Sequence, residues 1–363
     1  MATEDNIVTL PNFKVKSVNS DFVVDEVYLK PHLTSIDDAL QTYLYVQKEN
    51  LTTFQLLQIL ADYFQMDAKD VSASGLKDEQ AVTRQLVSIQ AVISAEQVNL
   101  ANNFFRREGL IISICDVIGY GQEPVYPRKL HGNKFSVTLR NVEGAVADKL
   151  AAYLVANKFF TLLNYYDEQR FGLPDSIHNT HHIGEQLLAD NWPEAYQEYL
   201  KSGNEQAERE RVKAAFDQTQ SHYQALQAVM PSKLDFFISS YNSYLWNQKL
   251  NEEIRQSGDT LQVELPYIGV VSLPLDNHTT IPAMLSLAVE QKNWQTGENF
   301  ARIKTRPAIL NIPVYRVGQE ADTLHLGNKQ AVTVAFYLPT GCYATMLVKQ
   351  LLLASIRDRF VYK

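Results

Sequence analysis

GLKDEQAVTRQ, residues 75–85, is a polar stretch in which one glycine leads into two carboxylates and two cations. Apolar and β-branched residues lie on both sides of it and predict short strands at residues 71–73 and 86–93. A polar loop between strands can present a side chain at the end of a sheet, and catalytic groups concentrate in such loops. A lone Lys-Asp-Glu string is also typical of a solvated turn, so the rest of the chain has to decide its role.

Strand and helix patterns alternate around this loop. Apolar residues at helical spacing predict helices at residues 52–66, 94–105 and 144–157, and Thr52 and Ser94 are suited to cap the first two. Runs rich in β-branched and aromatic residues predict strands at residues 21–29, 39–48, 110–118 and 135–140. The first part of the chain is therefore expected to mix strands and helices.

The pattern changes after residue 172. Helical spacing dominates from there to about residue 295, interrupted by a hairpin at residues 261–273. Strands return at residues 308–310 and 332–338, and a helix is expected at 343–357. A strand-rich start, a helical middle and a strand-rich end predict an α+β domain that is interrupted by an inserted, mostly helical domain.

Composition indicates a globular protein that can build a core, because 45% of the 363 residues are hydrophobic. No segment approaches the roughly 18 uninterrupted apolar residues of a membrane helix, and MATEDNIVTL shows no secretory pattern. We therefore expect a cytoplasmic protein that does not enter a membrane. Cys115 and Cys342 each lie in an apolar run, which favours two buried thiols over a disulfide.

Net charge argues against a general nucleic-acid binder, because the formal charge is −8 at pH 7. RNA binding would need a local basic face, since phosphate neutralisation supplies much of the affinity. These side chains could also be ordinary solvated charges. The candidates for such a face are Lys14, Lys16, Arg106, Arg107, Arg128, Lys129, Lys134, Arg140, Lys304 and Arg306.

The stretch at residues 75–85 resembles the signature of the TruD family of pseudouridine synthases, Gly-x-Lys-Asp-x-x-Ala-Val-Thr-x-Gln. Further motifs follow in the family's order across nearly the whole chain. They are FKVKSVNSDFVVDE (residues 13–26), HGNKF (131–135), NYYDEQRFG (164–172), FISSYNSYLWN (237–247) and FYLPTGCYATMLVKQLL (336–352). Asp167 departs from the pattern, because the family usually has glycine there, and it would add a negative charge near bound RNA.

The resemblance implies an α+β fold, with a mixed and mainly antiparallel sheet in the pseudouridine synthase catalytic domain. That domain would comprise residues 1–172 and 306–363, and residues 173–305 would form the inserted TruD-type domain. The implied reaction isomerises uridine in RNA, most often at tRNA position 13, without a metal, nucleotide or other cofactor. The expected partner is RNA, in particular tRNA, and the expected state is a monomer.

The same resemblance assigns roles to single residues. Asp78 matches the catalytic aspartate, and Lys16 matches a lysine expected beside it. An ionised carboxylate could attack the sugar or the base, or abstract a proton from the sugar, and the sequence leaves these routes open. Phe135 is expected to stack on the extruded base, with Asn133 near the loop or the base, and Asn164 and Thr345 are weaker pocket candidates. Gln169 and Arg170 could bind phosphate or support the loop, and the remaining substrate-binding candidates are Phe22, Glu26 and Lys77.

Other functions remain open at this point. The histidines of HNTHH, residues 178–182, have spacing that would suit zinc ligands on a helix, although no cysteine or metalloprotease-type glutamate accompanies them. A member of the family that binds RNA without modifying it is a second alternative. A synthase acting on an RNA other than tRNA is a third.

Overall fold

The chain divides into two compact units in the computed structural model, which describes residues 7–126, 130–172, 177–204, 206–229, 231–275 and 281–357. Unit 1 comprises Met1–Leu10, Thr161–Asn311 and Cys342–Lys363, and unit 2 comprises Pro11–Phe160 and Ile312–Gly341. These limits differ from the catalytic and inserted domains expected from the sequence. The functional division of the chain stays a prediction.

Most strands of unit 2 belong to a mixed sheet with the strand order β6-β3-β5-β2-β7-β14-β13-β8, and β4 pairs with β5. Strands β2 and β5 run parallel, whereas β3, β6, β7, β13 and β14 pair antiparallel with their neighbours. The expectation of an α+β fold with a mainly antiparallel sheet is confirmed. The strands are β2 (Phe22–Tyr28), β3 (Gln41–Glu49), β4 (Val71–Ala73), β5 (Val82–Ile89), β6 (Ile112–Gly121), β7 (Leu130–Glu143), β8 (Phe159–Leu163), β13 (Ile309–Ala321) and β14 (Lys329–Pro339).

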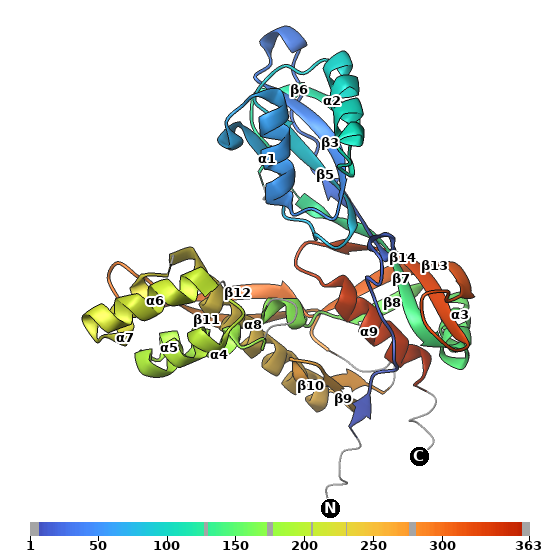
Figure 1. Ribbon diagram of the computed structural model, residues 1–363. Helices are drawn as coiled ribbons and strands as arrows, with labels where there is room; N and C mark the ends of the chain where they lie inside the picture. The colour runs from blue at the N-terminus through green and yellow to red at the C-terminus, as the bar shows by residue number, and fades with distance from the viewer. Residues whose placement is uncertain are drawn as a thin grey trace, which may run out of the picture. The chain divides into compact units, whose positions relative to one another are not determined.

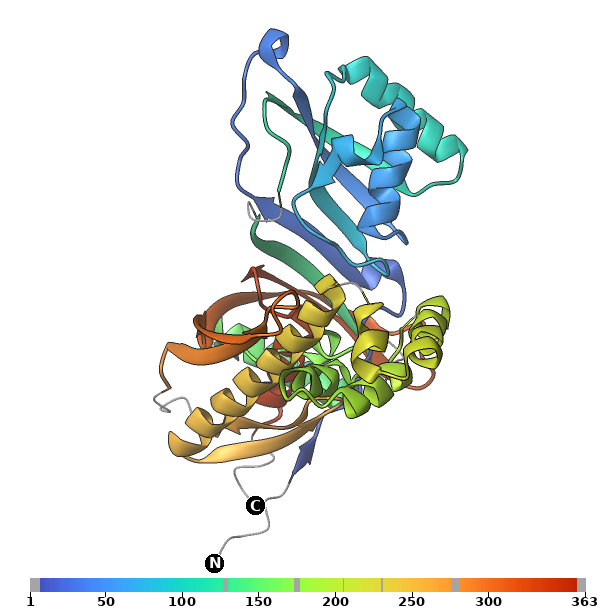
Figure 2. The same cartoon turned by 90° about the vertical axis from the view of Figure 1, so that its left-hand side faces the viewer.

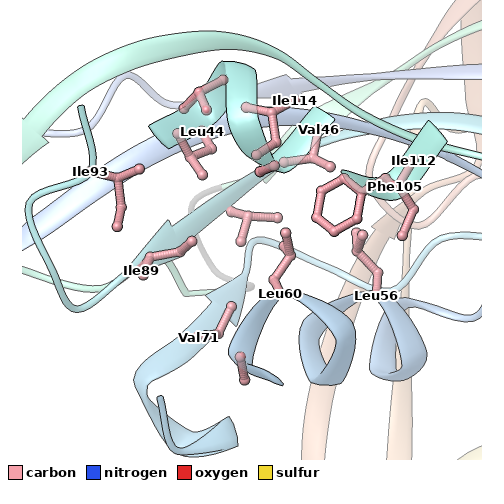
Figure 3. Close-up of a cluster of buried hydrophobic side chains, with 14 residues drawn as sticks. Leu44, Val46, Leu56, Leu60, Val71, Ile89, Ile93, Phe105, Ile112 and Ile114 are labelled. Atoms are coloured by element: carbon pink, nitrogen blue, oxygen red, sulfur yellow. The ribbon is translucent and has the colours of Figure 1, made fainter. Parts of the chain in front are cut away.

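Two helices, α1 (Thr53–Phe64) and α2 (Ala95–Arg107), cover one face of this sheet (Figures 1 and 2). Each begins with a capping box, in which Thr52 or Ser94 accepts a bond from the backbone three residues later and that residue's glutamine bonds back. Figure 3 shows Leu56 and Leu60 of α1 directed toward Val46 and Phe105. The third helix of the unit, α3 (Gly144–Ala156), packs on β7 and β14.

Unit 1 is mostly helical and packs around a long helix, α8 (Pro231–Gln256). At Gly184 of α4 (Thr180–Leu188), α4 and α8 approach so closely that a β-carbon would lie 2.0 Å from the Phe237 carbonyl oxygen, which requires glycine. The other helices are α4 (Thr180–Leu188), α5 (Trp192–Lys201), α6 (Gln206–Thr219), α7 (His222–Gln227) and α9 (Ala344–Ser355). A small sheet contains β1 (Val8–Thr9), β9 (Thr260–Leu265) and β10 (Gly269–Pro274), of which β9 and β10 form the expected hairpin.

A second hairpin in unit 1 was not expected from the sequence. Strands β11 (Met284–Lys292) and β12 (Asn299–Pro307) pair antiparallel in a two-stranded sheet, where helical structure was predicted to reach about residue 295. Nearly all of β12 is exposed on both faces. It therefore lacks the alternation of buried and exposed residues by which strands are recognised.

Two further expectations are wrong in detail. Strand β5 begins at Val82, four residues before the predicted start, so the second half of the 75–85 motif is already strand. Cys115 is exposed, because it alternates along β6 with the buried Ile112 and Ile114 and faces away from the core. Cys342 is half-buried, and both cysteines are free. Over the part of the chain that the structure describes, each helix is too short or too polar to span a membrane.

Candidate active site

Asp78 lies on the loop between β4 and β5, where its carboxylate forms an ion pair with Lys16. The Lys16 Nζ atom is 2.6 Å from Asp78 Oδ2. The Asp78 side chain is 41% exposed and Lys16 is 17% exposed, so the carboxylate can still be reached from solvent. The structure thus brings together the two residues that the sequence predicted as the catalytic pair.

The backbone at Lys16 is unusual, because its φ angle is +60° in the left-handed region. A residue other than glycine rarely adopts this conformation, and strained positions of this kind cluster at functional sites. The turn directs the Lys16 ammonium over the ring of Phe22, 4.4 Å from the centroid, as well as toward Asp78. The predicted residue Phe22 therefore packs under the cation of the pair.

Lys48 binds the backbone of the Asp78 loop from the buried side. Its fully buried ammonium donates hydrogen bonds to the carbonyl oxygens of Asp78, at 2.7 Å, and Leu51, at 2.6 Å. Burial lowers the pKa of Lys48 to about 8, and the cation of Lys77 adds to this, while Asp78 and Glu79 act against it. Lys48 is not among the site residues predicted from the sequence.

Lys77, which precedes Asp78 in the loop, is buried in an ion pair. Lys77 Nζ contacts Glu26 of β2, and the two side chains are 4% and 0% exposed. Glu26 also accepts from the Ser74 hydroxyl and from the Leu86 backbone N–H at 3.2 Å. Burial raises the pKa of Glu26, while Lys77 acts in the opposite direction. This geometry makes Lys77 and Glu26 supports of the loop, and their contact with substrate stays a prediction.

The start of α1 provides a further anchor for the loop. Thr53 Oγ1 accepts a 2.9 Å hydrogen bond from the Lys77 backbone N–H and donates to Gln85 at 3.3 Å. Gln85 is the last residue of the signature and is fully buried. The loop backbone is therefore bound at the Lys77 N–H and at the Asp78 carbonyl, on either side of the peptide bond that joins these two residues.

Aromatic rings from three neighbouring strands pack together in the same sheet. Phe135 of β7 lies edge-on to Phe22, with centroids 5.8 Å apart, and stacks on Phe336 of β14 at 5.4 Å. Phe135 is only partly buried, so part of its surface is available to a ligand. Asn133 is paired in register with Glu26, and its Oδ1 is buried without a hydrogen-bond partner among the described residues.

The predicted residues Gln169 and Arg170 lie in unit 1. Arg170 donates to the hydroxyl groups of Ser243, at 2.9 Å, and Ser239, both on α8, while Gln169 is exposed. The weaker candidates serve as supports: Asn164 accepts from Arg306 at 2.7 Å, and Thr345 donates to Asp167. The structure places these residues in the other compact unit from Asp78.

The sequence predicts that Asp167 adds a negative charge near bound RNA. In the structure its charge does not face solvent. Its side chain is fully buried and accepts from Lys349 Nζ at 2.7 Å and from the Thr345 hydroxyl. Lys349 is itself buried, so the carboxylate and the ammonium neutralise each other inside unit 1. Asp167 therefore adds no unpaired negative charge that could repel RNA.

The expected basic face is realised only in part. Arg140 is bound to Asp21 at 2.7 Å and to Asp322 at 3.3 Å, and Arg306 is buried. Arg106, Arg107, Lys134 and Lys304 are exposed, and Lys14 is exposed at a backbone bridge with Arg140. Arg128 and Lys129 lie outside the described residues.

The histidines of HNTHH, residues 178–182, pack against aromatic and polar neighbours. His181 is buried against Phe171 and Tyr244, and burial lowers its pKa to about 4, with His182 adding to this. His182 lies 3.9 Å from Glu185 on the exposed side of α4, and His178 stacks on Tyr267. Among the described residues, no group of three His, Cys, Asp or Glu side chains could hold a metal ion.

Comparison with known proteins gives a consistent result. The sequence model of a family described as tRNA pseudouridine synthase D (TruD) matches residues 12–219. A protein of Pyrobaculum islandicum named as a probable tRNA pseudouridine synthase D is 24% identical, over 93% of this chain and 91% of its own. The tRNA pseudouridine synthase D of Aquifex aeolicus is 23% identical, over 96% of this chain and 100% of its own.

A solved structure is also similar in fold. It is that of a candidate tRNA pseudouridine synthase D (TruD) from Methanosarcina mazei, with a TM-score of 0.66 and 16% sequence identity. The match covers 97% of this chain and 96% of the other. At this level of identity the likeness concerns the fold alone.

Proposed function

Because the chain belongs to the TruD family of tRNA pseudouridine synthases, we propose that it isomerises the uridine at tRNA position 13, with Asp78 as its catalytic carboxylate. The single observation that carries this proposal is the ion pair of Lys16 with Asp78, 2.6 Å apart, where Asp78 lies on a loop whose backbone is bound by Lys48 and Thr53. A family member that only bound RNA would have no need for a carboxylate held in this way.

The chemistry requires a charged group but no outside reagent. The bond from the sugar C1′ to the uracil N1 breaks, the base turns, and a bond from C1′ to C5 forms. The hydrogen on C5 is lost, and N1 gains one, so substrate and product have the same composition. No oxidant, reductant or nucleotide is therefore consumed.

Asp78 suits each of the three routes open to a carboxylate in this reaction. It can attack C1′, add to the base, or take a proton from the sugar, and each route uses the ionised form. Lys16 neutralises and orients that carboxylate while leaving it 41% exposed to an incoming nucleotide. We assign Lys16 to positioning the carboxylate and to balancing its charge during the reaction.

The uridine must leave its stack to reach Asp78, which costs a few kcal/mol. An aromatic ring that stacks on the extruded base returns about 1–3 kcal/mol. Phe135 is the ring we assign to this role, because it is partly exposed and is held in place by Phe22 and Phe336. Asn133, whose Oδ1 has no partner among the described residues, would accept a hydrogen bond from an N–H group of the uracil.

The finer points of the proposal are the target position, a monomeric state and a cytoplasmic location. To test the first, unmodified tRNA transcripts with uridine or cytidine at position 13 are incubated with the protein, and pseudouridine is mapped by carbodiimide labelling. The proposal expects product at position 13 of the first transcript alone. Product at another position, or only in another RNA, would replace the assigned target.

A further inference from the structure

Three cations of unit 1 surround the side chain of Tyr166. The guanidinium of Arg306 lies 3.9 Å from the ring centroid, and that of Arg170 lies 5.9 Å from it. Lys304 donates a 3.2 Å hydrogen bond to the phenol oxygen. Burial raises the pKa of Tyr166, but Arg306, Lys304 and Arg170 together outweigh it and lower that pKa.

The positive charge of this cluster is not balanced within the described residues. Arg170 donates to two serine hydroxyls, and Arg306 donates to Asn164, so neither forms an ion pair there. The adjacent acid Asp167 is already bound to Lys349. Arg306 is 7% exposed, and its buried Nε has no hydrogen-bond partner among the residues that the structure describes. An unpaired donor on a buried cation is uncommon, so the guanidinium of Arg306 keeps hydrogen-bonding capacity beyond its contacts with Asn164.

The cations continue along β12, the orange strand in Figure 1. Arg302, Lys304 and Arg306 alternate along the strand, so they share one face at intervals of about 6.8 Å. Such an interval is similar to the separation of successive phosphates in an RNA strand. Both Arg302 and Lys304 are exposed, and among the residues described neither forms an ion pair with a carboxylate.

A cavity of about 650 Å³ lies beside Arg302, between β12 and α8. Its lining includes Ser239, which also holds Arg170, and the rings of Trp294 and Phe300. Phe300 is 51% exposed and thus offers a face on which a base can stack. Asp235 also lines the cavity and accepts the Trp294 indole N–H at 3.0 Å, which leaves a carboxylate oxygen for base N–H groups.

We propose that the cavity and the cations beside it, Arg170, Arg302, Lys304 and Arg306, form a groove that binds a single-stranded segment of the RNA substrate. Arg170 and Lys304 contact one phosphate, with Arg306 adding charge beneath them, and Arg302 contacts the next. The nucleotide between these phosphates enters the cavity and stacks on Phe300. This inference rests on the proposed function, because it takes RNA as the substrate.

The test measures how salt changes the affinity of the full chain for unmodified tRNA. Each phosphate contact that is lost should reduce the slope of log K against log salt by about 1. Lys304→Gln and Arg302→Gln should each lower the slope by this amount and weaken binding several-fold at low salt. The matched control is Lys213→Gln, which removes an exposed cation from α6, outside the groove. It should leave the slope unchanged.

The stacking contact is tested separately with Phe300→Ala. This variant should bind RNA about 10-fold more weakly with the wild-type salt slope, because it removes a ring and no charge. Wild-type slopes in both Lys304→Gln and Arg302→Gln would overturn the groove, whatever the activity of the protein. Groove-dependent binding without pseudouridine formation would instead overturn the proposed function and leave the groove standing. Absence of any RNA binding would overturn both.

Discussion

The ammonium of Lys48 donates a 2.7 Å hydrogen bond to the backbone carbonyl of Asp78. Lys48 is fully buried and has two carbonyl oxygens as its hydrogen-bond acceptors. A buried cation is costly, and this one is located beneath the residue that we assign to catalysis. Its two hydrogen bonds offset part of this cost, and they fix the loop in the position that the proposed chemistry needs.

Replacing Lys48 with methionine should impair catalysis more than binding. Methionine keeps the volume of the side chain but removes both hydrogen bonds to the loop, so the Asp78 carboxylate shifts from its place. A misplacement of about 1 Å can cost about 10²-fold in rate. We expect kcat to fall by 10- to 100-fold with KM changed little, and Lys48→Arg to recover part of the loss. Steady-state kinetics on tRNA measure this, and an unchanged kcat in Lys48→Met would refute the role.

The pKa of Lys48, lowered from 10.5 to about 8, predicts opposite effects of alkaline pH on stability and on activity. Between these values the unfolded chain binds the proton that the folded chain has released, so the free energy of unfolding rises with pH. Activity should fall over the same range, because neutral Lys48 bonds the Asp78 carbonyl less strongly. Denaturant titrations and kcat between pH 7 and 10 measure the two trends. Lys48→Arg should lose both, and if it keeps them they have another source.

The buried pair of Asp167 and Lys349 should contribute to stability only while both partners are present. Lys349→Met leaves an uncompensated buried carboxylate and should lower the free energy of unfolding by about 3–5 kcal/mol. Asp167→Asn combined with Lys349→Met should recover most of that loss. The control Lys201→Met breaks the pair of the exposed Lys201 with Glu198, which keeps its hydrogen bond from Asn179, and should have a much smaller effect. Additive effects of the two substitutions would show that the pair is not coupled.

Phe135 should matter for turnover through its ring. Phe135→Leu keeps an apolar side chain beside Phe22 and Phe336 but removes the stacking surface. With stacking worth about 1–3 kcal/mol, kcat/KM should fall by roughly 5- to 150-fold, while Phe135→Tyr stays close to wild type. Thermal unfolding of both variants checks that they remain folded. Wild-type kcat/KM in a folded Phe135→Leu variant would exclude the stack.

Features with local causes were predictable from the sequence. The cap at Thr52 and the helix that follows depend on residues close together in the chain, and the structure has both. Lys48 could have been found as well, because it follows Leu44 and Val46 at two-residue spacing and so lies on the same buried face of β3. The partner of Asp167 could not, since Lys349 is 182 residues away and only the fold brings it near. Strand β12 escaped prediction because exposure on both faces erases its alternation.

The most direct test of the account is tritium release from tRNA labelled at uracil C5, with Asp78→Asn as the matched variant. Asparagine has nearly the shape of aspartate but lacks its charge, so the variant should fold and bind tRNA while it releases no tritium. The account predicts release by the wild type alone. Equal release by both proteins would contradict the role of Asp78. No release by a wild-type protein that binds unmodified tRNA would contradict the tRNA synthase function itself.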